Sequence, residues 1–468
     1  MVDCFINDSS LSAIADAIRK QTGHDSTWKL YPYQMAGEIR KDLGNVKEFV
    51  EGTLTHLTDN KVSYVAPYAF YNYTALSEVS MPACTQIDDL AFAGCTMLQT
   101  ISFPLCSAIT AQTFASCKNI AQAALGLTEI SSNANADTHT FVLSVAAGSL
   151  RTLELPQCSY IGSRAFLHKS KFKYPNLNKV IAQNCTLVDY AAFSGGTTLV
   201  TFEAANCTSI SKGAFNGCTN LSSAYFPLCD TILDDAFNKC TSLTDVYLPI
   251  CNTNNTTVFA NCKEIKVATI GSTDITSTTN PLSAAISALQ ELSISQCLSI
   301  GMNTFKDYVS LSKIDAERCT NIDTSAFAGC THLDYISFPA CQHIGMSAFC
   351  GCSGLTYCDF SACQTLGACA FQDCANISYM SLPACSHIGH SVFLNCEKLY
   401  NLTLPGPVMV VLDSTDAFDN TPIMGSSKFN AYGSIYVPNN LVDSYKVATN
   451  WSNFSSQIYP IADFNQEE

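Results

Sequence analysis

Cysteine is the residue type with the greatest potential for chemistry in this sequence. The chain holds 25 cysteines among 468 residues, enough for several disulfides or a metal centre. Their spacing predicts a structural role instead, because they recur every 11 residues from Cys84 to Cys117, from Cys207 to Cys262 and from Cys319 to Cys396. Two cysteines per 22-residue coil form two ladders with parallel Cβ vectors, a poor geometry for a disulfide. We expect reduced, buried thiols that donate weak hydrogen bonds to backbone carbonyls.

Within the repeats, Cys350, Cys358 and Cys369 lie off these ladders. The pair Cys350-x-Cys352 could form the edge of a metal site. However, Cys358 occupies the coil position of Ile336, which is a core position, and no second C-x-x-C pair with zinc spacing follows. The sequence therefore predicts no metal and no cofactor.

The histidines and acids give no catalytic constellation. His343 and His387 share a coil position two coils apart, with Thr365 between them. At the spacing of paired strands this separates them by more than about 9 Å, too far to share a metal. No H-E-x-x-H, G-x-S-x-G or phosphate-binding loop is present. We expect a protein without catalytic residues, and a hydrolase built on this scaffold is the alternative.

Exposed strand positions offer the better candidates for binding. Tyr335, Tyr357 and Tyr379 share one position in three successive coils, and Tyr225 and Tyr247 share another. Tyrosine gives rigid, amphipathic contact area that suits a glycan ring or a protein. The alternative is a stacking ladder that only stabilises the sheet. The candidate ligand-binding residues are Tyr335, Tyr357, Tyr379, Tyr225, Tyr247, Asp245, Asp315, Asp359, His343 and His387.

A period of 22 residues must position all of these side chains. The phenylalanine of a repeated Ala-Phe pair marks it, at Phe70 to Phe114, Phe193 to Phe259 and Phe305 to Phe393. A unit of this length buries its apolar face only by stacking on its neighbours. The sequence predicts a repeat solenoid of about 16 coils, each with a short parallel strand and a short 3₁₀ or helical return.

The repeat bounds three regions. Residues 1–45 form a helical N-terminal module that serves as a cap or as an attachment element, with helices expected over Leu11–Ile18 and Tyr33–Leu43. Residues 46–425 form the solenoid, with irregular coils near 118–165 and 263–304 that resemble each other and should each carry a short helix. Residues 426–468 form a C-terminal cap, with strands at 433–438 and 458–461 and a helix at 441–451.

Charge and hydropathy exclude several classes of partner. The net charge is −15 and no basic run stands out, which argues against nucleic acid and anionic membranes. No stretch of about 18 apolar residues is present, so we expect no membrane insertion. The N-terminus shows no signal-peptide pattern, so we expect cytoplasmic synthesis without one.

The most regular coil carries a family resemblance. The run Ile344-Gly345-x-x-Ala348-Phe349-x-x-Cys352, after a strand that ends in Pro339, resembles the BspA-like leucine-rich repeats, also called the Treponema pallidum type. The resemblance covers about residues 50–420 and implies bacterial or phage proteins that adhere to proteins or surfaces. The departures are a second cysteine ladder and the missing signal and anchor.

Two shorter stretches resemble a different group. Leu11–Arg19, and Ile435–Pro438 with Asn450-Trp451, are similar to elements of virion-associated proteins from phages of Gram-positive bacteria. Together the resemblances imply a non-enzymatic recognition protein, associated with a phage tail, that binds a cell-surface protein or glycan. Its N-terminal module would then dock to the virion or to a partner protein. The alternative is a bacterial surface or secreted adhesin for host or cell–cell attachment.

Overall fold

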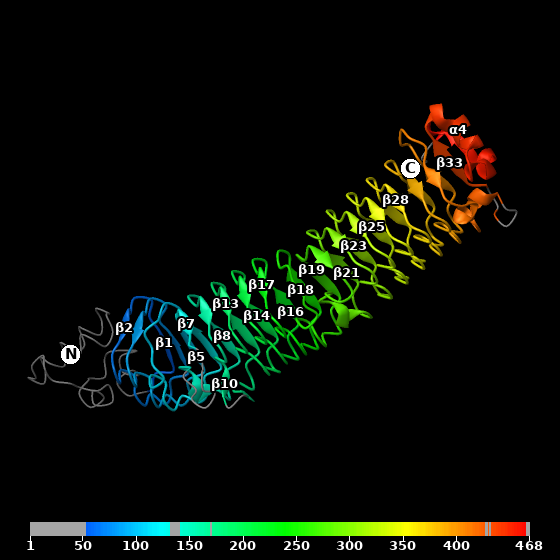
Figure 1. The fold of residues 1–468 in the computed structure, drawn as a ribbon. Helices are drawn as coiled ribbons and strands as arrows, with labels where there is room; N and C mark the ends of the chain where they lie inside the picture. Colours follow the sequence, from blue (N-terminus) through cyan, green and yellow to red (C-terminus); the bar gives the residue numbers. More distant parts are fainter. Residues whose placement is uncertain (1–52, 132–140, 169–170, 426–428, 430–431, 465–468) are drawn as a thin grey trace, which may run out of the picture. The chain divides into compact units, whose positions relative to one another are not determined.

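The computed structural model describes residues 53–131, 141–168, 171–425, 429 and 432–464. The helices expected over Leu11–Ile18 and Tyr33–Leu43 therefore lie outside the described residues. The chain divides into two units, Met1–Ser242 and Leu243–Glu468. Both are β-solenoids built from coils of about 22 residues with little helix, as expected from the period (Figure 1).

The first unit carries one long parallel sheet and rows of two-residue strands. The long sheet consists of β1 (His56–Thr58), β3 (Glu78–Ser80), β5 (Thr100–Phe103), β6 (Gln122–Leu125), β8 (Thr152–Glu154), β12 (Lys179–Ile181) and β14 (Thr201–Glu203). Next to β14 lies β16 (Ser223–Tyr225). The short strands are β2 (Tyr64–Val65) and β4 (Gln86–Ile87) in one row, and β7 (Glu129–Ile130), β9 (Tyr160–Ile161), β13 (Leu187–Val188), β15 (Ser209–Ile210) and β17 (Thr231–Ile232) in another. A small antiparallel hairpin, β10 (Leu167–His168) with β11 (Lys171–Phe172), accounts for one longer coil.

The second unit repeats this plan. Its long sheet includes β18 (Asp245–Leu248), β19 (Val267–Ile270), β21 (Glu291–Ser293), β23 (Lys313–Asp315), β25 (Tyr335–Ser337) and β27 (Tyr357–Asp359). A four-stranded sheet follows, with β29 (Tyr379–Ser381), β31 (Asn401–Thr403), β33 (Ser434–Val437) and β34 (Ile458–Pro460). The short strands are β20 (Asp274–Ile275), β22 (Ser299–Ile300), β24 (Asn321–Ile322), β26 (His343–Ile344), β28 (Thr365–Leu366), β30 (His387–Ile388) and β32 (Val411–Leu412).

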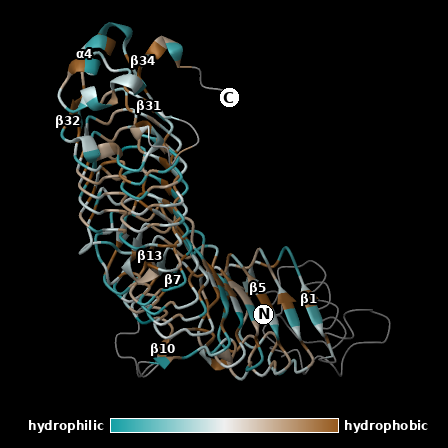
Figure 2. Ribbon diagram, turned by 90° about the vertical axis from the view of Figure 1, so that its right-hand side faces the viewer, coloured by the Kyte–Doolittle hydropathy of each residue, from teal (hydrophilic) through white to brown (hydrophobic). Residues whose placement is uncertain are grey.

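Alternation along each coil decides which side chains are buried. In β25 the middle residue Ile336 is fully buried, whereas Tyr335 points outward, as the period of two in a strand requires. Figure 2 shows hydrophobic and hydrophilic residues alternating along the coils. On the return path the phenylalanines stack on one another: the rings of Phe327 and Phe349 lie 5.2 Å apart, and those of Phe349 and Phe371 lie 5.3 Å apart. Each coil therefore completes its core only through its neighbours.

The cysteine ladders take the role that their spacing predicts. In the first ladder, Sγ–H donates to the phenylalanine carbonyl of the preceding coil, as in Cys352 to the Phe327 oxygen at 3.2 Å. In the second, Sγ–H donates to a carbonyl two residues further on, as in Cys207 to the Ser209 oxygen at 3.4 Å. Burial raises the pKa of the Cys207 thiol to about 11, so it stays protonated at neutral pH. The expectation of weak S–H donors to backbone carbonyls is confirmed.

The two irregular coils are alike, as the sequence predicts. Each replaces the regular return with one 3₁₀ turn, η2 (Ser144–Ala146) and η3 (Ser283–Ala285), whose third residue is buried. The residues that precede them, Leu143 and Leu282, have nearly the same backbone conformation. The regular returns differ from expectation, because they are tight turns with left-handed residues, such as Ser347 with φ of 54° and Gly351 with φ of 76°.

The C-terminal residues continue the sheet. β33 pairs in parallel with β31, and β34 pairs in parallel with β33, which explains why the solenoid makes about 18 turns where about 16 coils were expected. The expected helix is shorter than predicted, α4 (Val442–Val447), and 3₁₀ turns supply the rest. These are η6 (Asn439–Leu441) and η7 (Trp451–Gln457), and further 3₁₀ turns outside the predicted helix are η4 (Thr415–Phe418), η5 (Pro422–Met424) and η8 (Ile461–Asp463). Trp451 is buried and its indole N–H donates to the Val410 carbonyl at 2.8 Å.

Candidate functional site

The clearest feature of the outward sheet face is a pair of stacked tyrosines. Tyr335 and Tyr357 are register partners on β25 and β27. Their ring centroids lie 5.1 Å apart with an angle of 4° between the planes. The two side chains remain 45% and 49% exposed. The two rings thus stack as the ladder alternative expects, and the pair also offers its surface to solvent.

The stacking determines which part of each ring a ligand can reach. Face-to-face contact covers one ring face of each tyrosine, so the ring edges and both hydroxyls form most of the accessible surface. Burial raises the pKa of Tyr357, and the Asp359 carboxylate and Tyr335 raise it further. The hydroxyl of Tyr357 therefore stays protonated and can donate a hydrogen bond at neutral pH.

Tyr379, the third tyrosine of this row, makes a different contact. Its ring stacks on Phe464, with centroids 5.5 Å apart and planes 10° apart. Its hydroxyl lies 3.2 Å from the Thr403 hydroxyl. Phe464 also packs against Tyr436 at 4.8 Å with a tilt of 58°. Phe464 was missed in the sequence, because this residue follows the repeats and belongs to no periodic position.

Of the predicted acids, two lie beside the stacked pair. Asp315, Ser337 and Asp359 are consecutive register partners, two residues along from Lys313, Tyr335 and Tyr357 and on the same side of the sheet. The Asp359 carboxylate accepts a hydrogen bond from the Ser361 N–H at 3.1 Å. The structure therefore brings two tyrosines and two carboxylates together on β23, β25 and β27.

The remaining members of the predicted set lie elsewhere. Asp245 and Tyr247 are on β18, separated from Tyr335 by β19, β21 and β23. Tyr225 is on β16 in the first unit. Between β19 and β23 the face is slightly hollowed, with a volume of about 120 Å³ whose lining includes Glu291 and Lys313. These two residues were missed, although their coil position is that of Tyr335.

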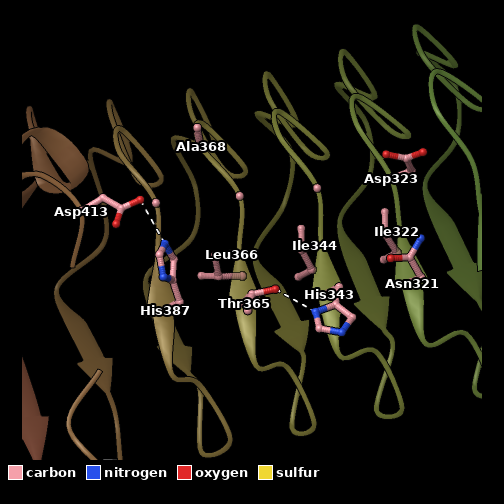
Figure 3. A pocket seen from close by; sticks show the side chains of 13 residues that line it. Asn321, Ile322, Asp323, His343, Ile344, Thr365, Leu366, Ala368, His387 and Asp413 are labelled. Atoms are coloured by element: carbon pink, nitrogen blue, oxygen red, sulfur yellow. Dashed lines mark hydrogen bonds and ion pairs between the residues drawn. The ribbon is translucent and has the colours of Figure 1, made fainter. Parts of the chain in front are cut away.

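His343 and His387 border a groove on the row of short strands. Figure 3 shows both imidazoles on the same side of this row, with Thr365 between them. His343 Nδ1 lies 2.9 Å from the Thr365 hydroxyl, and His387 Nε2 lies 3.0 Å from an oxygen of Asp413. The groove has a volume of about 460 Å³. The two histidines are thus engaged with different neighbours.

Three glycines without side chains line the groove. Gly345, Gly367 and Gly389 occupy one position in three successive coils. A Cβ on Gly345 or Gly367 would lie 2.7 Å from the backbone of the preceding coil, and one on Gly389 would lie 2.8 Å from it. Asp323 and Asp413 take the same position in the adjacent coils, so a carboxylate stands at each end. The Asp323 and Asp413 carboxylates can accept hydrogen bonds at the ends of the groove, and the side chains that border one side can do so between them.

The side chains of the tyrosine pair and of the groove are of types that can contact a ligand. Within the ranges that the structure describes, no three His, Cys, Asp or Glu side chains are placed to hold a metal ion. A search of the same residues for a helix long and apolar enough to cross a bilayer finds none. Stacked rings, hydroxyls and carboxylates thus lie together on the sheet of a repeat protein.

Comparison with known proteins agrees with this class. The model of the BspA type leucine-rich repeat region matches residues 47–167, 159–280 and 298–424. The chain belongs to the BspA-type leucine-rich repeat family, whose members are typically non-enzymatic. No curated protein matches the sequence significantly.

Similar folds occur among solved structures of bacterial proteins. A leucine-rich repeat protein from Bacteroides ovatus is 17% identical, with 84% of this chain and 89% of that chain covered and a TM-score of 0.31. An internalin from Listeria monocytogenes is 15% identical, with 88% and 92% covered and a TM-score of 0.39. A leucine-rich cell surface protein from Faecalibacterium prausnitzii is 19% identical, with 76% and 80% covered and a TM-score of 0.24. Similarity at this level concerns the repeat architecture alone.

Proposed function

We propose that the protein is a non-enzymatic recognition protein that binds a protein or glycan at a cell surface through the outward face of β23, β25 and β27. The observation that carries this proposal is the exposed, stacked pair Tyr335 and Tyr357 beside Asp315 and Asp359. Rigid aromatic side chains lose little conformational entropy on binding and combine apolar area with a hydroxyl. The neighbouring carboxylates supply acceptors for ligand hydroxyls or for basic groups.

Membership of the BspA-type family supports an adhesin of the bacterial surface, or a secreted one, as the setting. Binding surfaces on solenoids form because equivalent positions recur in neighbouring coils, as the tyrosine pair does here. Fractionation of the producing cells into cytoplasm, surface and medium tests this setting. Recovery of the protein from the cytoplasm alone would count against it.

A phage virion is the second candidate setting. The similarity of Leu11–Arg19 to virion-associated proteins favours it, although this segment lies outside the described residues. The second similar stretch, Ile435–Pro438, falls on β33. Mass spectrometry of purified particles distinguishes the two settings, since only a structural component would remain with the particles through purification.

Arrays of glycans and of cell-surface proteins test the binding function. We expect Tyr357→Ala to lose at least about tenfold in affinity for the array hit, which corresponds to about 1.4 kcal/mol. Tyr190→Ala is the matched control, because Tyr190 is 40% exposed but lies in the first unit. His387→Ala tests the groove separately. Unchanged binding by Tyr357→Ala would show that the tyrosine pair is only part of the scaffold.

A further inference from the structure

The contact between Phe464 and Tyr379 differs in kind from the other ring stacks of the protein. The phenylalanines of the return path stack inside the core, and the Tyr335–Tyr357 pair joins two adjacent coils. Phe464 instead comes from the segment after the last strand. It lies between Tyr379 of β29 and Tyr436 of β33, and so spans the outward side of β31.

Within the described residues, the hydrogen bonds of the turn that leads to Phe464 are local or long. The turn η8 (Ile461–Asp463) that precedes it contains no buried residue. The Phe464 N–H donates to the Ile461 carbonyl within the same turn, at 3.1 Å. The Ala462 N–H reaches the Asn439 side chain only at 3.4 Å. The ring itself is half-buried and contacts the rings of Tyr379 and Tyr436.

The space between Tyr379 and Tyr436 suits a planar ring. One wall is parallel to the ring it holds, at 10°, and the other is tilted by 58°. The hydroxyl of Tyr379 already has the Thr403 hydroxyl as its partner. A pyranose ring is thicker and carries hydroxyls that need polar partners, whereas the faces of the two rings are apolar. An aromatic side chain needs none.

We propose that Tyr379 and Tyr436 form a subsite for an aromatic side chain presented by a partner protein, and that Phe464 occupies it as a built-in competitor. This inference rests on the proposed function, because it assumes that the sheet face is the recognition surface. It commits the partner to a protein rather than a glycan. It also makes Phe464 a determinant of affinity, because a partner must displace it. If Phe464 occupies the subsite about nine-tenths of the time, displacement weakens apparent binding about tenfold.

Fluorine NMR on the full chain labelled with 3-fluorotyrosine tests the proposal. Tyr379→Phe assigns the resonance of Tyr379 by its disappearance. Phe464→Ala should move this resonance, and N-acetylphenylalaninamide should then titrate it. In the wild-type chain the same probe should bind about tenfold more weakly, because Phe464 competes. A chain that ends at Asp463 should behave like Phe464→Ala. This second variant controls for any effect that the alanine itself has on the Tyr379 resonance.

Three outcomes would overturn the proposal. Equal titration of the wild type and Phe464→Ala would show that Phe464 does not compete. No response of Tyr379 in either protein would show that no subsite exists. A response to methyl glucoside but not to the amide would assign the subsite to a glycan. Failure of the proposed function would give a different result. Tyr357→Ala would then bind the array hit as tightly as the wild type does, while the Tyr379 resonance would still respond to N-acetylphenylalaninamide.

Discussion

Raising the pH is the perturbation that best tests how the buried thiols stabilise this protein. Burial raises the pKa of Cys158, Cys207 and Cys385 to about 11 each, whereas an unperturbed thiol titrates near ~8.5. The folded chain therefore keeps these protons to higher pH than the unfolded chain does. Their contribution to stability is complete below about pH 8.5 and is lost as the pH rises towards about 11.

The size of the effect follows from this difference. At pH 10 a thiol with a folded pKa of about 11 has lost about 2 kcal/mol of stabilisation. Cys158, Cys207 and Cys385 together lose about 6 kcal/mol, which compares with about 5–15 kcal/mol for the whole stability of a typical domain. The thiols of Cys185, Cys341 and Cys363, with pKa values of about 12, add to this. Buried tyrosines such as Tyr308, with a pKa of about 12, matter only above about pH 10.

Urea unfolding followed by far-ultraviolet circular dichroism, with a non-thiol reductant present, measures the effect. We expect a constant midpoint between about pH 6.5 and 8 and a steep fall between about pH 8.5 and 10. Cys207→Ala should reduce the pH-dependent loss by about 2 kcal/mol, because one titrating group is gone. Thr208→Ala is the matched control: it removes the hydrogen bond to the Thr186 carbonyl but no titrating proton. A flat midpoint up to pH 10, or the same pH slope in Cys207→Ala and the wild type, would refute the reasoning.

Three further predictions concern packing and charge. Phe349→Ala removes a fully buried ring that stacks on both neighbours and should cost about 3–5 kcal/mol in urea unfolding; a cost below about 1 kcal/mol would contradict the stacked core. Gly367→Ala should destabilise by about 1–3 kcal/mol, because its Cβ would lie 2.7 Å from the preceding coil. Gly148→Ala is the matched control, since its Cβ would meet nothing within 4 Å, and equal costs would refute the close approach. Asp413→Asn should change stability by less than about 1 kcal/mol, because its ion pair with His387 is solvent-exposed; a larger loss in the same assay would mean that the pair fixes the groove.

The periodic part of the fold could be predicted in detail. A repeated sequence contains several copies of each position. The equivalents of Phe349 and Cys352 in the other coils therefore all indicate the same inward and turn positions. The binding candidates were harder, because a ladder of tyrosines is compatible with both stacking and recognition. The structure shows that Tyr335 and Tyr357 stack and are also exposed.

What could not be predicted depends on contacts that the period does not encode. The two-residue strands, such as His343–Ile344, are too short to show alternation. The position of Phe464 on Tyr379 depends on the path of the last turns, which no repeat specifies. The pairing of His387 with Asp413 involves the lengthened last coil, where the step is no longer 22 residues. The boundaries at 45 and 425 stay predictions.

The dependence of each coil on its neighbours has a mechanical consequence. A coil holds to the next through parallel strand pairs, ring stacks and sulfhydryl bonds, and it has no separate core of its own. Tension applied along the chain would therefore peel coils away from an end one after another. Each detached coil of 22 residues would add about 75 Å of slack. The protein would lengthen stepwise under load and absorb work gradually. The coils not yet detached would stay folded and would provide the edge on which the detached coils refold.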